Sequence, residues 1–396
     1  MDLNFGAAYQ DFQTEVESFL AQHWPPPKGA SREERAAATA NFRLAATERG
    51  YLYRNVPRRY GGAEQPPNVI KAEILRRAFA KARAPMEVPG NGVALLVPTL
   101  LDCGPEWQKE QFIAPTLRGE ITWCQGYSEP GAGSDLASVR SKAELVDGQW
   151  VINGHKIWTT LAYQATHMFA LVRTEPEASK HEGISYLLLD MKQPGITIRR
   201  IRQISGQSEF CEVFFDGATT PADWIVGERG KGWQVSRSTL KHERNLVGGS
   251  ARTQALFDSL VRFAKTTIRN GRPASEDPVV RSRLAAIEGA VKSHIYSSYH
   301  QLTKEAAGEP LGILLHLNKL SSTEIAKSIA TLAQDILAED GLHMPPAEGG
   351  AATEHPELWL NQIFGSLALS IAGGASNIQR NIISERGLDL PREQGV

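Results

Sequence analysis

The densest group of chemistry-bearing residues is the segment Trp123–Asp135, which reads WCQGYSEPGAGSD. Its glycines expose backbone N–H groups, and the hydroxyls of Ser128 and Ser134 can donate hydrogen bonds. The segment therefore suits a polar planar ring or a phosphate. A tight structural loop is the alternative, because Gly131-Ala132-Gly133 lacks the third glycine and the following helix of a dinucleotide-binding fingerprint.

A glutamate further along the chain has the surroundings of a general base. The residues three and four positions from Glu243 on a helix are Thr239, Leu240, Leu246 and Val247, and none of them is cationic. Glu243 thus belongs to a largely apolar stripe, where burial is expected to raise its pKa towards neutrality. Arg244 follows it and is a candidate for orienting the base or binding a substrate phosphate, with a solvated helix arginine as the alternative.

Other titratable residues give weaker candidates. Glu129 lies in the glycine-rich segment before Pro130, so we expect a structural hydrogen-bonding role for it. The ten histidines show no HExxH or comparable spacing, and the three cysteines form no CxxC pair. We therefore predict no metal site and no disulfide framework.

Composition excludes several classes of protein. The 396 residues carry 43 basic and 44 acidic side chains, which argues against a general nucleic-acid binder or a polybasic membrane-surface protein. No run approaches the roughly 18 apolar residues that a membrane-spanning helix needs. We expect a cytoplasmic protein in a reducing compartment.

The elements that position these residues change type twice along the chain. Apolar residues recur at helical spacing from Tyr9 to His23 and from Asn68 to Ala82, and Pro105 suits the first turn of a helix reaching about Leu117. Asn153-Gly154 then predicts a β-hairpin between Gln149–Ile152 and His155–Trp158. Further strands are expected at 167–173, 184–190, 196–201 and 211–215, which suits a small β-barrel.

Helical periodicity returns after Gly232. It predicts helices at 233–270, 279–306, 313–338 and 359–386, with a loop at 345–356. The chain is accordingly divided into an N-terminal α-helical domain (1–120), a central β-barrel domain (121–230) and a C-terminal α-helical bundle (231–396).

The segment SEPGAGSD, Ser128–Asp135, resembles the first signature of the acyl-CoA dehydrogenases. Four further motifs occur in the order of that family: Tyr60-Gly61-Gly62, Asn153–Thr160, Gly230–Trp233 and Gly373–Ile383. The resemblance covers essentially the whole chain. It implies an α+β, mainly α fold with a helical domain, a β-barrel and a four-helix bundle, in the same order as the elements expected from periodicity.

The resemblance implies FAD as cofactor. Gln125, Tyr127 and Ser128 then line the pyrimidine side of the isoalloxazine, and Trp158 lies beside the ring. The full set of positions assigned to the cofactor is Gln125, Tyr127, Ser128, Ser134, Trp158, Thr159, Thr160, Arg269, Gly374 and Asn377. Thr159 and Thr160 lie near the redox-active N5, where hydrogen-bond donors favour the reduced flavin. Ser134, Arg244 and Gly373 are assigned to the substrate.

The resemblance also implies the reaction. A carboxylate removes the α-proton of an acyl-CoA thioester while the β-hydride passes to flavin N5, which leaves a trans-2,3-enoyl thioester. Many family members carry the base directly before the glycine of the last signature, but that position here is Gly373. A glutamate at the helix position of Glu243 is the family's alternative base, found in members that act on branched, long-chain or steroid side-chain acyl groups. Glu243 is therefore the expected catalytic base, and a bulky acyl chain is the expected substrate.

Some motifs depart from the family pattern. The segments that complete a neighbouring flavin site read Arg269–Pro273 and Asp335–Gly341 here, and Ala375 stands where threonine is usual. The chain is therefore expected to form either a homotetramer or a heterotetramer with a related subunit, with an electron-transfer flavoprotein as acceptor. A flavin monooxygenase on the same fold, a non-catalytic subunit and a carrier-protein thioester as substrate remain alternatives.

Overall fold

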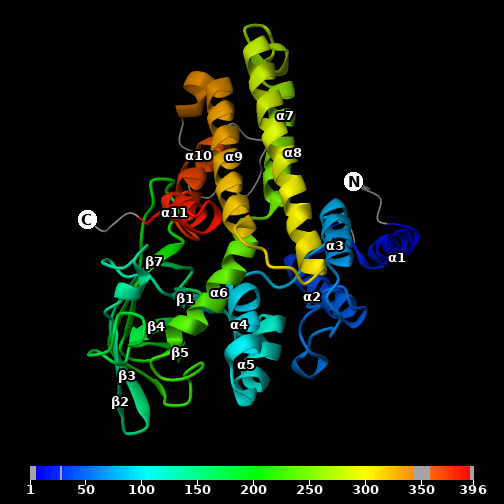
Figure 1. Cartoon of the computed structure of the whole chain (residues 1–396). Helices are drawn as coiled ribbons and strands as arrows, with labels where there is room; N and C mark the ends of the chain where they lie inside the picture. The colour runs from blue at the N-terminus through cyan, green and yellow to red at the C-terminus, as the bar shows by residue number, and fades with distance from the viewer. Residues whose placement is uncertain (1–5, 27–28, 343–356, 393–396) are drawn as a thin grey trace. The chain divides into compact units, whose positions relative to one another are not determined.

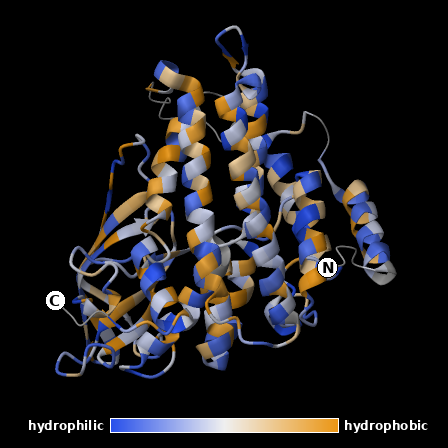
Figure 2. Ribbon diagram, turned by 45° about the horizontal axis from the view of Figure 1, so that its top comes forward, coloured by the Kyte–Doolittle hydropathy of each residue, from blue (hydrophilic) through white to orange (hydrophobic). Residues whose placement is uncertain are grey.

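The computed structural model describes residues 6–26, 29–342 and 357–392. These residues form two compact units: residues 1–199 with 210–239, and residues 200–209 with 240–396. The expected loop at 345–356 lies outside the described residues. Along the helices of Figure 2, hydrophobic and hydrophilic residues alternate, which is the pattern of amphipathic helices.

The first unit begins with helices (Figure 1). They are α1 (Ala7–His23), α2 (Arg32–Glu48), α3 (Val69–Ala82), α4 (Val97–Cys103), which follows a π-helical turn at Gly92–Leu96, and α5 (Glu106–Arg118). The predicted helices at 9–23, 68–82 and 105–117 are confirmed. Periodicity missed α2, whose start is instead marked by a capping box between Ser31 and Glu34.

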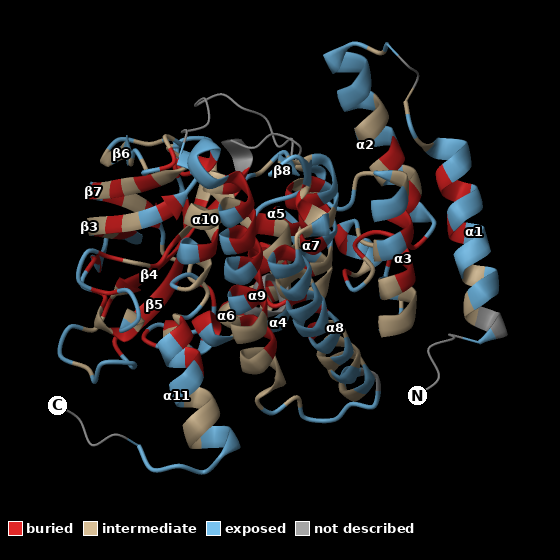
Figure 3. Cartoon of the chain, turned by 90° about the horizontal axis from the view of Figure 1, so that it is seen from above, coloured by how far each residue is buried: buried red, intermediate tan, exposed pale blue. Residues whose placement is uncertain are grey.

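The remainder of the first unit is a seven-stranded sheet. Its strands are β1 (Trp123–Gly126), β2 (Lys142–Val146), β3 (Gln149–Thr160), β4 (His167–Arg173), β5 (Ile184–Asp190), β6 (Ile196–Arg200) and β7 (Phe210–Pro221). The order is β1-β4-β2-β3-β7-β6, and β5 pairs with β4. β4 and β5 are nearly continuous apolar strands and are buried along most of their length (Figure 3).

The hairpin predicted at Asn153-Gly154 is wrong. β3 runs through both residues, and Asn153 pairs with Lys142 on one side and with Asp216 on the other. The ladder shifts register there, so the two residues form a bulge inside a central strand. The real hairpin turn is Asp147-Gly148, with φ of 49° and 76°, because left-handed φ at both central residues matches the twist of the flanking strands.

The second unit is helical. α6 (Gly232–Val247) enters it from the first unit, followed by α7 (Ser250–Thr266), a short hairpin of β8 (Ile268–Arg269) and β9 (Arg272–Pro273), α8 (Pro278–Ala306), α9 (Leu314–Leu337), α10 (Glu357–Leu369) and α11 (Ser376–Gly387). α9 packs against α7, α8, α10 and α11 (Figure 1). Its buried face includes Ile325, Ile329 and Ile336 and joins one hydrophobic core with α7 and α8.

Two of the predicted long helices are broken. The expected helix at 233–270 is interrupted at Gly249, whose extended backbone caps α7. The expected helix at 359–386 is interrupted by a turn in which Gly373 and Gly374 have φ of 64° and 90°. Such left-handed angles favour glycine and end a helix, whereas the apolar periodicity continues across the break.

Candidate functional site

The glycine-rich segment after β1 is hydrogen-bonded to a buried lysine, Lys156. The side chain of Lys156 on β3 is fully buried, and its ammonium donates to the carbonyl of Tyr127 (3.2 Å), to the carbonyl of Leu171 (2.6 Å) and to Oε1 of Glu129 (2.7 Å). One side chain thus joins β3, β4 and the segment that follows β1. A buried ammonium with three acceptors is satisfied, which is the condition for placing a charge inside a protein.

Glu129 completes this cluster. Its carboxylate also accepts from the backbone N–H groups of Arg140 (2.6 Å) and Ser141 (2.9 Å), so the expected hydrogen-bonding role of Glu129 is confirmed. Burial raises the pKa of Glu129, but the charge of Lys156 and these hydrogen bonds outweigh it, and the pKa lies below its ordinary value. Burial lowers the pKa of Lys156, and Glu129 opposes that effect.

Trp158 lies on β3 two residues beyond this lysine. The β3–β7 ladder shifts between Lys156 and Thr159, and Trp158 takes a left-handed φ of 60°. Trp158 is 56 % exposed, and its ring meets that of Phe210 edge-on. A large aromatic residue in this backbone region is strained, and such strain is typical of functional sites.

The residues of the first unit fit an isoalloxazine. Ile157 donates its N–H to the carbonyl of Ser128 (2.9 Å), so the glycine-rich segment lies directly beside Trp158. Oγ1 of Thr159 is buried without a hydrogen-bond partner among the described residues, which leaves it available to a bound group. The side chain of Thr160 is exposed, as is the indole. An open aromatic surface next to the unpaired hydroxyl of Thr159 suits a flavin ring.

The other residues assigned to the cofactor in this unit differ in burial. Tyr127 is buried, with its ring edge-on to Phe169 and Tyr186. Gln125 and Ser128 are half-buried, and Ser134 is exposed. Ser134 therefore lies at the surface, where a ligand phosphate or acyl-CoA can reach it.

In the second unit, Glu243 lies half-buried on α6. Lys319 on α9 is fully buried and donates to the carbonyl of Leu369 at the end of α10 (2.9 Å). Burial lowers the pKa of Lys319, and the charge of Glu243 opposes this effect. The side chain of Arg244 falls outside the described residues.

The turn between α10 and α11 carries Gly373 and Gly374. Their carbonyls accept from Nε2 of Gln379 at 3.4 and 3.1 Å, and Nδ1 of His316 donates to Oε1 of Gln379 at 2.6 Å. A Cβ added to Gly374 would collide with the Gln379 amide. The turn is therefore built for glycine at this position.

The structure brings some of the predicted site residues together. Tyr127, Ser128, Trp158 and Thr159 meet in the first unit around Lys156. In the second unit, Lys319 binds the end of α10, four residues before Gly373. The two remaining positions of this unit lie on other segments. Asn377 accepts from Arg380 on α11, and Arg269 lies in the β8–β9 hairpin.

Sequence reasoning missed the two buried lysines. Lys156 belongs to the motif Asn153–Thr160, whose aromatic and hydroxyl residues indicate a site. No pattern in the neighbouring residues predicts that the lysine is buried. The same holds for Lys319, which lies in the mixed segment Leu314–Leu320, LLHLNKL.

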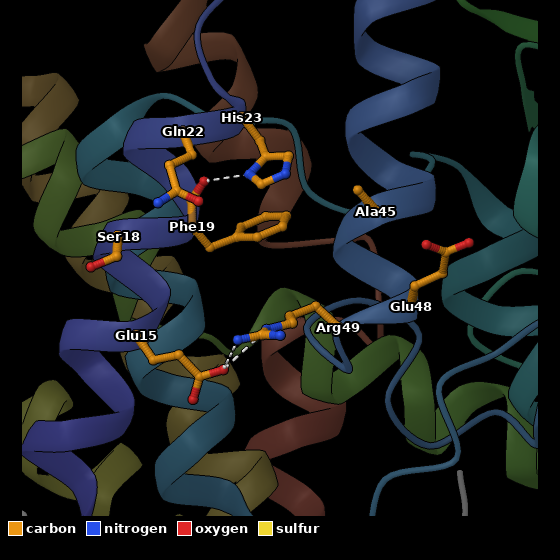
Figure 4. A pocket seen from close by; sticks show the side chains of 8 residues that line it. All are labelled: Glu15, Ser18, Phe19, Gln22, His23, Ala45, Glu48 and Arg49. Carbon is orange, nitrogen blue, oxygen red and sulfur yellow. Dashed lines mark hydrogen bonds and ion pairs between the residues drawn. The ribbon is translucent and has the colours of Figure 1, made fainter.

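The first unit contains cavities away from and next to the predicted site. One of about 650 Å³ is lined by residues of α1, α2 and the following Arg49, including Phe19 and His23 (Figure 4). It holds none of the predicted site residues, and its charged side chains Glu15 and Arg49 pair with each other at 3.0 Å. A second, of about 280 Å³, lies against the glycine-rich segment at Glu129, Pro130 and Gly131. This smaller cavity therefore adjoins the predicted site.

The described residues contain neither a metal-binding cluster nor a membrane-spanning helix. No group of three His, Cys, Asp or Glu side chains is placed to hold a metal ion. No helix within these ranges is long and apolar enough to cross a membrane.

Three family models match the chain in succession. They describe the N-terminal domain (residues 7–120), the middle domain (124–218) and the C-terminal domain (230–388) of acyl-CoA dehydrogenases. Acyl-CoA dehydrogenase IpdE1 of Mycobacterium tuberculosis is 38 % identical over 403 residues, with 97 % of this chain and 98 % of the relative covered. IpdE1 of Mycolicibacterium smegmatis is 36 % identical with the same coverage.

A solved structure has the same fold over its whole length. The Tcur3481-Tcur3483 steroid ACAD matches with a TM-score of 0.79 and 26 % identity, covering 99 % of this chain and 100 % of the solved chain. The expected helical, sheet and helical regions of the fold are thereby confirmed, and so is the resemblance from which FAD was expected. Sequence motifs, architecture and relatives agree, and this chain belongs to the acyl-CoA dehydrogenase family, whose members are FAD-dependent oxidoreductases.

Proposed function

We propose that Glu243 is the catalytic base with which this enzyme oxidises an acyl-CoA thioester to its trans-2,3-enoyl form. The observation that carries the proposal is the contrast between two positions in the second unit. Gly373 has only a backbone, whose carbonyl accepts from Gln379, whereas Glu243 offers a half-buried carboxylate. A carboxylate in partly desolvated surroundings is suited to removing a proton near neutral pH.

Different residues are proposed to bind FAD, to remove the proton and to contact the substrate. Trp158 offers its exposed face to the isoalloxazine, and Thr159, Thr160, Ser128, Tyr127 and Gln125 surround the ring. Bound FAD supplies the acceptor for the β-hydride at N5. Glu243 takes the α-proton of the thioester onto a carboxylate oxygen. Ser134, Arg244 and Gly373 are proposed to contact the substrate, and Arg269, Gly374 and Asn377 to contact FAD.

The proposed substrate carries a bulky, branched or steroid-derived acyl chain. Gly373 has no side chain at the position where many family members place a glutamate, which leaves more room there. The similar solved structure is that of a steroid ACAD, which supports the same substrate class. A panel of thioesters tests the proposal, because best turnover with short straight chains would contradict it.

The visible spectrum of the purified protein tests the base. Anaerobic addition of a substrate thioester should bleach the bound flavin, and Glu243→Gln should abolish the bleaching while the flavin stays bound. Glu288→Gln, the same change at an exposed position on α8, is the matched control and should bleach normally. Bleaching that survives Glu243→Gln would rule out Glu243 as the base. Flavin that no thioester bleaches but oxygen rapidly reoxidises would favour a monooxygenase instead.

The proposed assembly is a heterotetramer with a related subunit, with a homotetramer as the alternative. The similar steroid ACAD is a Tcur3481-Tcur3483 protein, and the segments Arg269–Pro273 and Asp335–Gly341 depart from the family pattern for a shared flavin site. Light scattering after size exclusion tests it: a stable tetramer of this chain alone, with one FAD per subunit, would exclude obligate pairing. An electron-transfer flavoprotein is the proposed electron acceptor, which reduction assays with that protein test.

Two further expectations remain proposals. We infer three domains at 1–120, 121–230 and 231–396, which the three separate family matches support. We also infer a cytoplasmic location, supported by the free thiols of Cys103, Cys124 and Cys211. Limited proteolysis and cell fractionation test these two points.

A further inference from the structure

The cavity of about 280 Å³ beside the glycine-rich segment combines a cation with a buried hydroxyl group. Arg140 and Ser141, just before β2, line it together with Gly154 and His155 of β3 and with residues 129–131 of the segment. Pockets for drug-sized ligands measure roughly 300–1,000 Å³, so this cavity suits a small chemical group.

Ser141 supplies the buried hydroxyl. The residue is 2 % exposed, and its Oγ has no hydrogen-bond partner among the described residues. The hydroxyl lies against Gly154, where an added Cβ would collide with it, and both residues line the cavity. A buried hydroxyl without a partner costs free energy, so Ser141 calls for a partner that occupies the cavity.

Arg140 supplies the cation. Its side chain is exposed at the cavity, and its guanidinium makes no hydrogen bond or ion pair within the described part of the chain. Only its backbone N–H is engaged, by the carboxylate of Glu129 at 2.6 Å. A guanidinium binds phosphate oxygens through two parallel hydrogen bonds, which a lysine cannot do.

The other titratable groups that line the cavity already have partners. The carboxylate of Glu129 is paired with Lys156 at 2.7 Å, and Nε2 of His155 lies 3.1 Å from Oε1 of Glu212. Among the titratable lining residues, all of which are described, Arg140 is therefore the one without a counter-charge. The cavity favours an anion.

The backbone of the segment adds a further donor. Glu129 and Ala132 exchange backbone hydrogen bonds of 3.0 Å, and the N–H of Gly131 between them has no backbone partner among the described residues. No atom of the described residues lies within 4 Å of the position that a Cβ of Gly131 would take. A backbone N–H, a hydroxyl and a guanidinium are the donors of phosphate sites.

We propose that this cavity is an anion site that takes the diphosphate of a nucleotide, bound by the guanidinium of Arg140, the hydroxyl of Ser141 and the N–H of Gly131. FAD and acyl-CoA both carry a diphosphate. FAD is the favoured source, because the cavity begins at Glu129, next to the proposed flavin contact Ser128. This choice rests on the proposed placement of the flavin ring beside Trp158.

Titration of the flavin-free, full-length protein with FAD and with riboflavin, which has no phosphate, tests the site. Arg140→Met should weaken FAD binding about 10- to 100-fold, because it removes hydrogen bonds to a charged group, and should leave riboflavin binding unchanged. Arg140→Lys keeps the charge without the fork and should give an intermediate loss. Lys142→Met, the same loss of charge at an exposed position on β2, is the control and should bind FAD like wild type.

Ser141→Ala gives a second readout. It should weaken FAD binding about 2- to 10-fold. The stability of the flavin-free protein should stay equal or rise, since the variant removes a buried hydroxyl without a partner. Loss of stability with unchanged FAD affinity would show that Ser141 is structural and would count against the site.

The substrate arm compares an acyl-CoA with the corresponding acyl-pantetheine, which lacks the diphosphate. If Arg140→Met spares FAD and raises the KM of the acyl-CoA alone, the site binds the diphosphate of the substrate, and FAD is excluded as its source. Equal losses for FAD and riboflavin, or no loss in either arm, would overturn the proposal. Unchanged riboflavin binding by Trp158→Ala would instead overturn the placement of the ring, so the two failures are distinguishable.

Discussion

The ammonium of Lys156 lies 2.7 Å from Oε1 of Glu129, and neither side chain is appreciably exposed. Glu129 belongs to the segment proposed to hold the flavin, and Lys156 lies two residues before Trp158. It ties the fold of the sheet to the shape of the cofactor site, because the same ammonium also binds the carbonyl of Tyr127.

Breaking this pair from one side should be costly. Lys156→Met leaves the carboxylate of Glu129 buried without its cation, and we expect a loss of about 3–5 kcal/mol in the free energy of unfolding. The double variant Glu129→Gln/Lys156→Met should lose less than the sum of the single variants, since no unpaired charge remains. Urea unfolding measures all three, with Lys142→Met as an exposed control. Additive losses would show that the pair is not coupled.

Trp158 should lower the stability of the flavin-free protein and strengthen FAD binding. Trp158→Gly removes the strain of a left-handed φ and should raise the stability of the flavin-free protein by about 1 kcal/mol, because glycine adopts such angles freely. Trp158→Ala keeps the Cβ and should show no such gain. Both variants lose the indole face and should bind FAD less tightly. Thermal unfolding of the flavin-free protein and FAD titration give the two readouts, and tight FAD binding by Trp158→Ala would exclude the proposed contact.

His294 should make the second unit sensitive to acid. Its ring nitrogens lie 3.1 Å from Oγ1 of Thr253 and 3.0 Å from the carbonyl of Gly248, next to the break between α6 and α7. Burial lowers its pKa from the ordinary 6.5, while the bond to Gly248 opposes this. The folded-state pKa is therefore below the unfolded one, so the stability linked to His294 is complete above pH 6.5 and is lost as the pH falls through the lowered pKa.

The measurement is the free energy of unfolding between pH 7.5 and pH 5. Wild type should lose stability across this range, whereas His294→Leu should start lower but change less. His300→Leu, an exposed histidine on the same helix, should follow wild type. Parallel curves for wild type and His294→Leu would contradict the prediction.

The Gly373–Gly374 turn should not tolerate a side chain at its second position. Gly374→Ala adds a Cβ that meets the Gln379 amide at a backbone φ of 90°, and we expect a loss of about 1–3 kcal/mol. Gly365→Ala, a position with open space around its Cβ, is the control and should be neutral or slightly stabilising. Equal stability of the two variants, measured by denaturant unfolding, would show that the turn is adaptable.

The sequence by itself determined the order of helices, strands and helices, the position of each motif and the family. These features depend on local periodicity and on short motifs, both of which can be identified within a single stretch of sequence. Helices at 9–23, 68–82, 279–306 and 313–338 were predicted close to their observed bounds for this reason.

Only the tertiary structure decided which turn closes a hairpin, where two long helices break and which charges meet. Asn153-Gly154 has the composition of a hairpin turn, yet β2 and β7 pair on both sides of it and make it a bulge, while Asp147-Gly148 makes the turn. Glu129 has no cation near it in the sequence, but Lys156 pairs with it at 2.7 Å from another segment, 27 positions along the chain. Strand pairing and buried charge pairs form between segments that are distant in sequence. Local sequence patterns therefore do not predict which residues become partners.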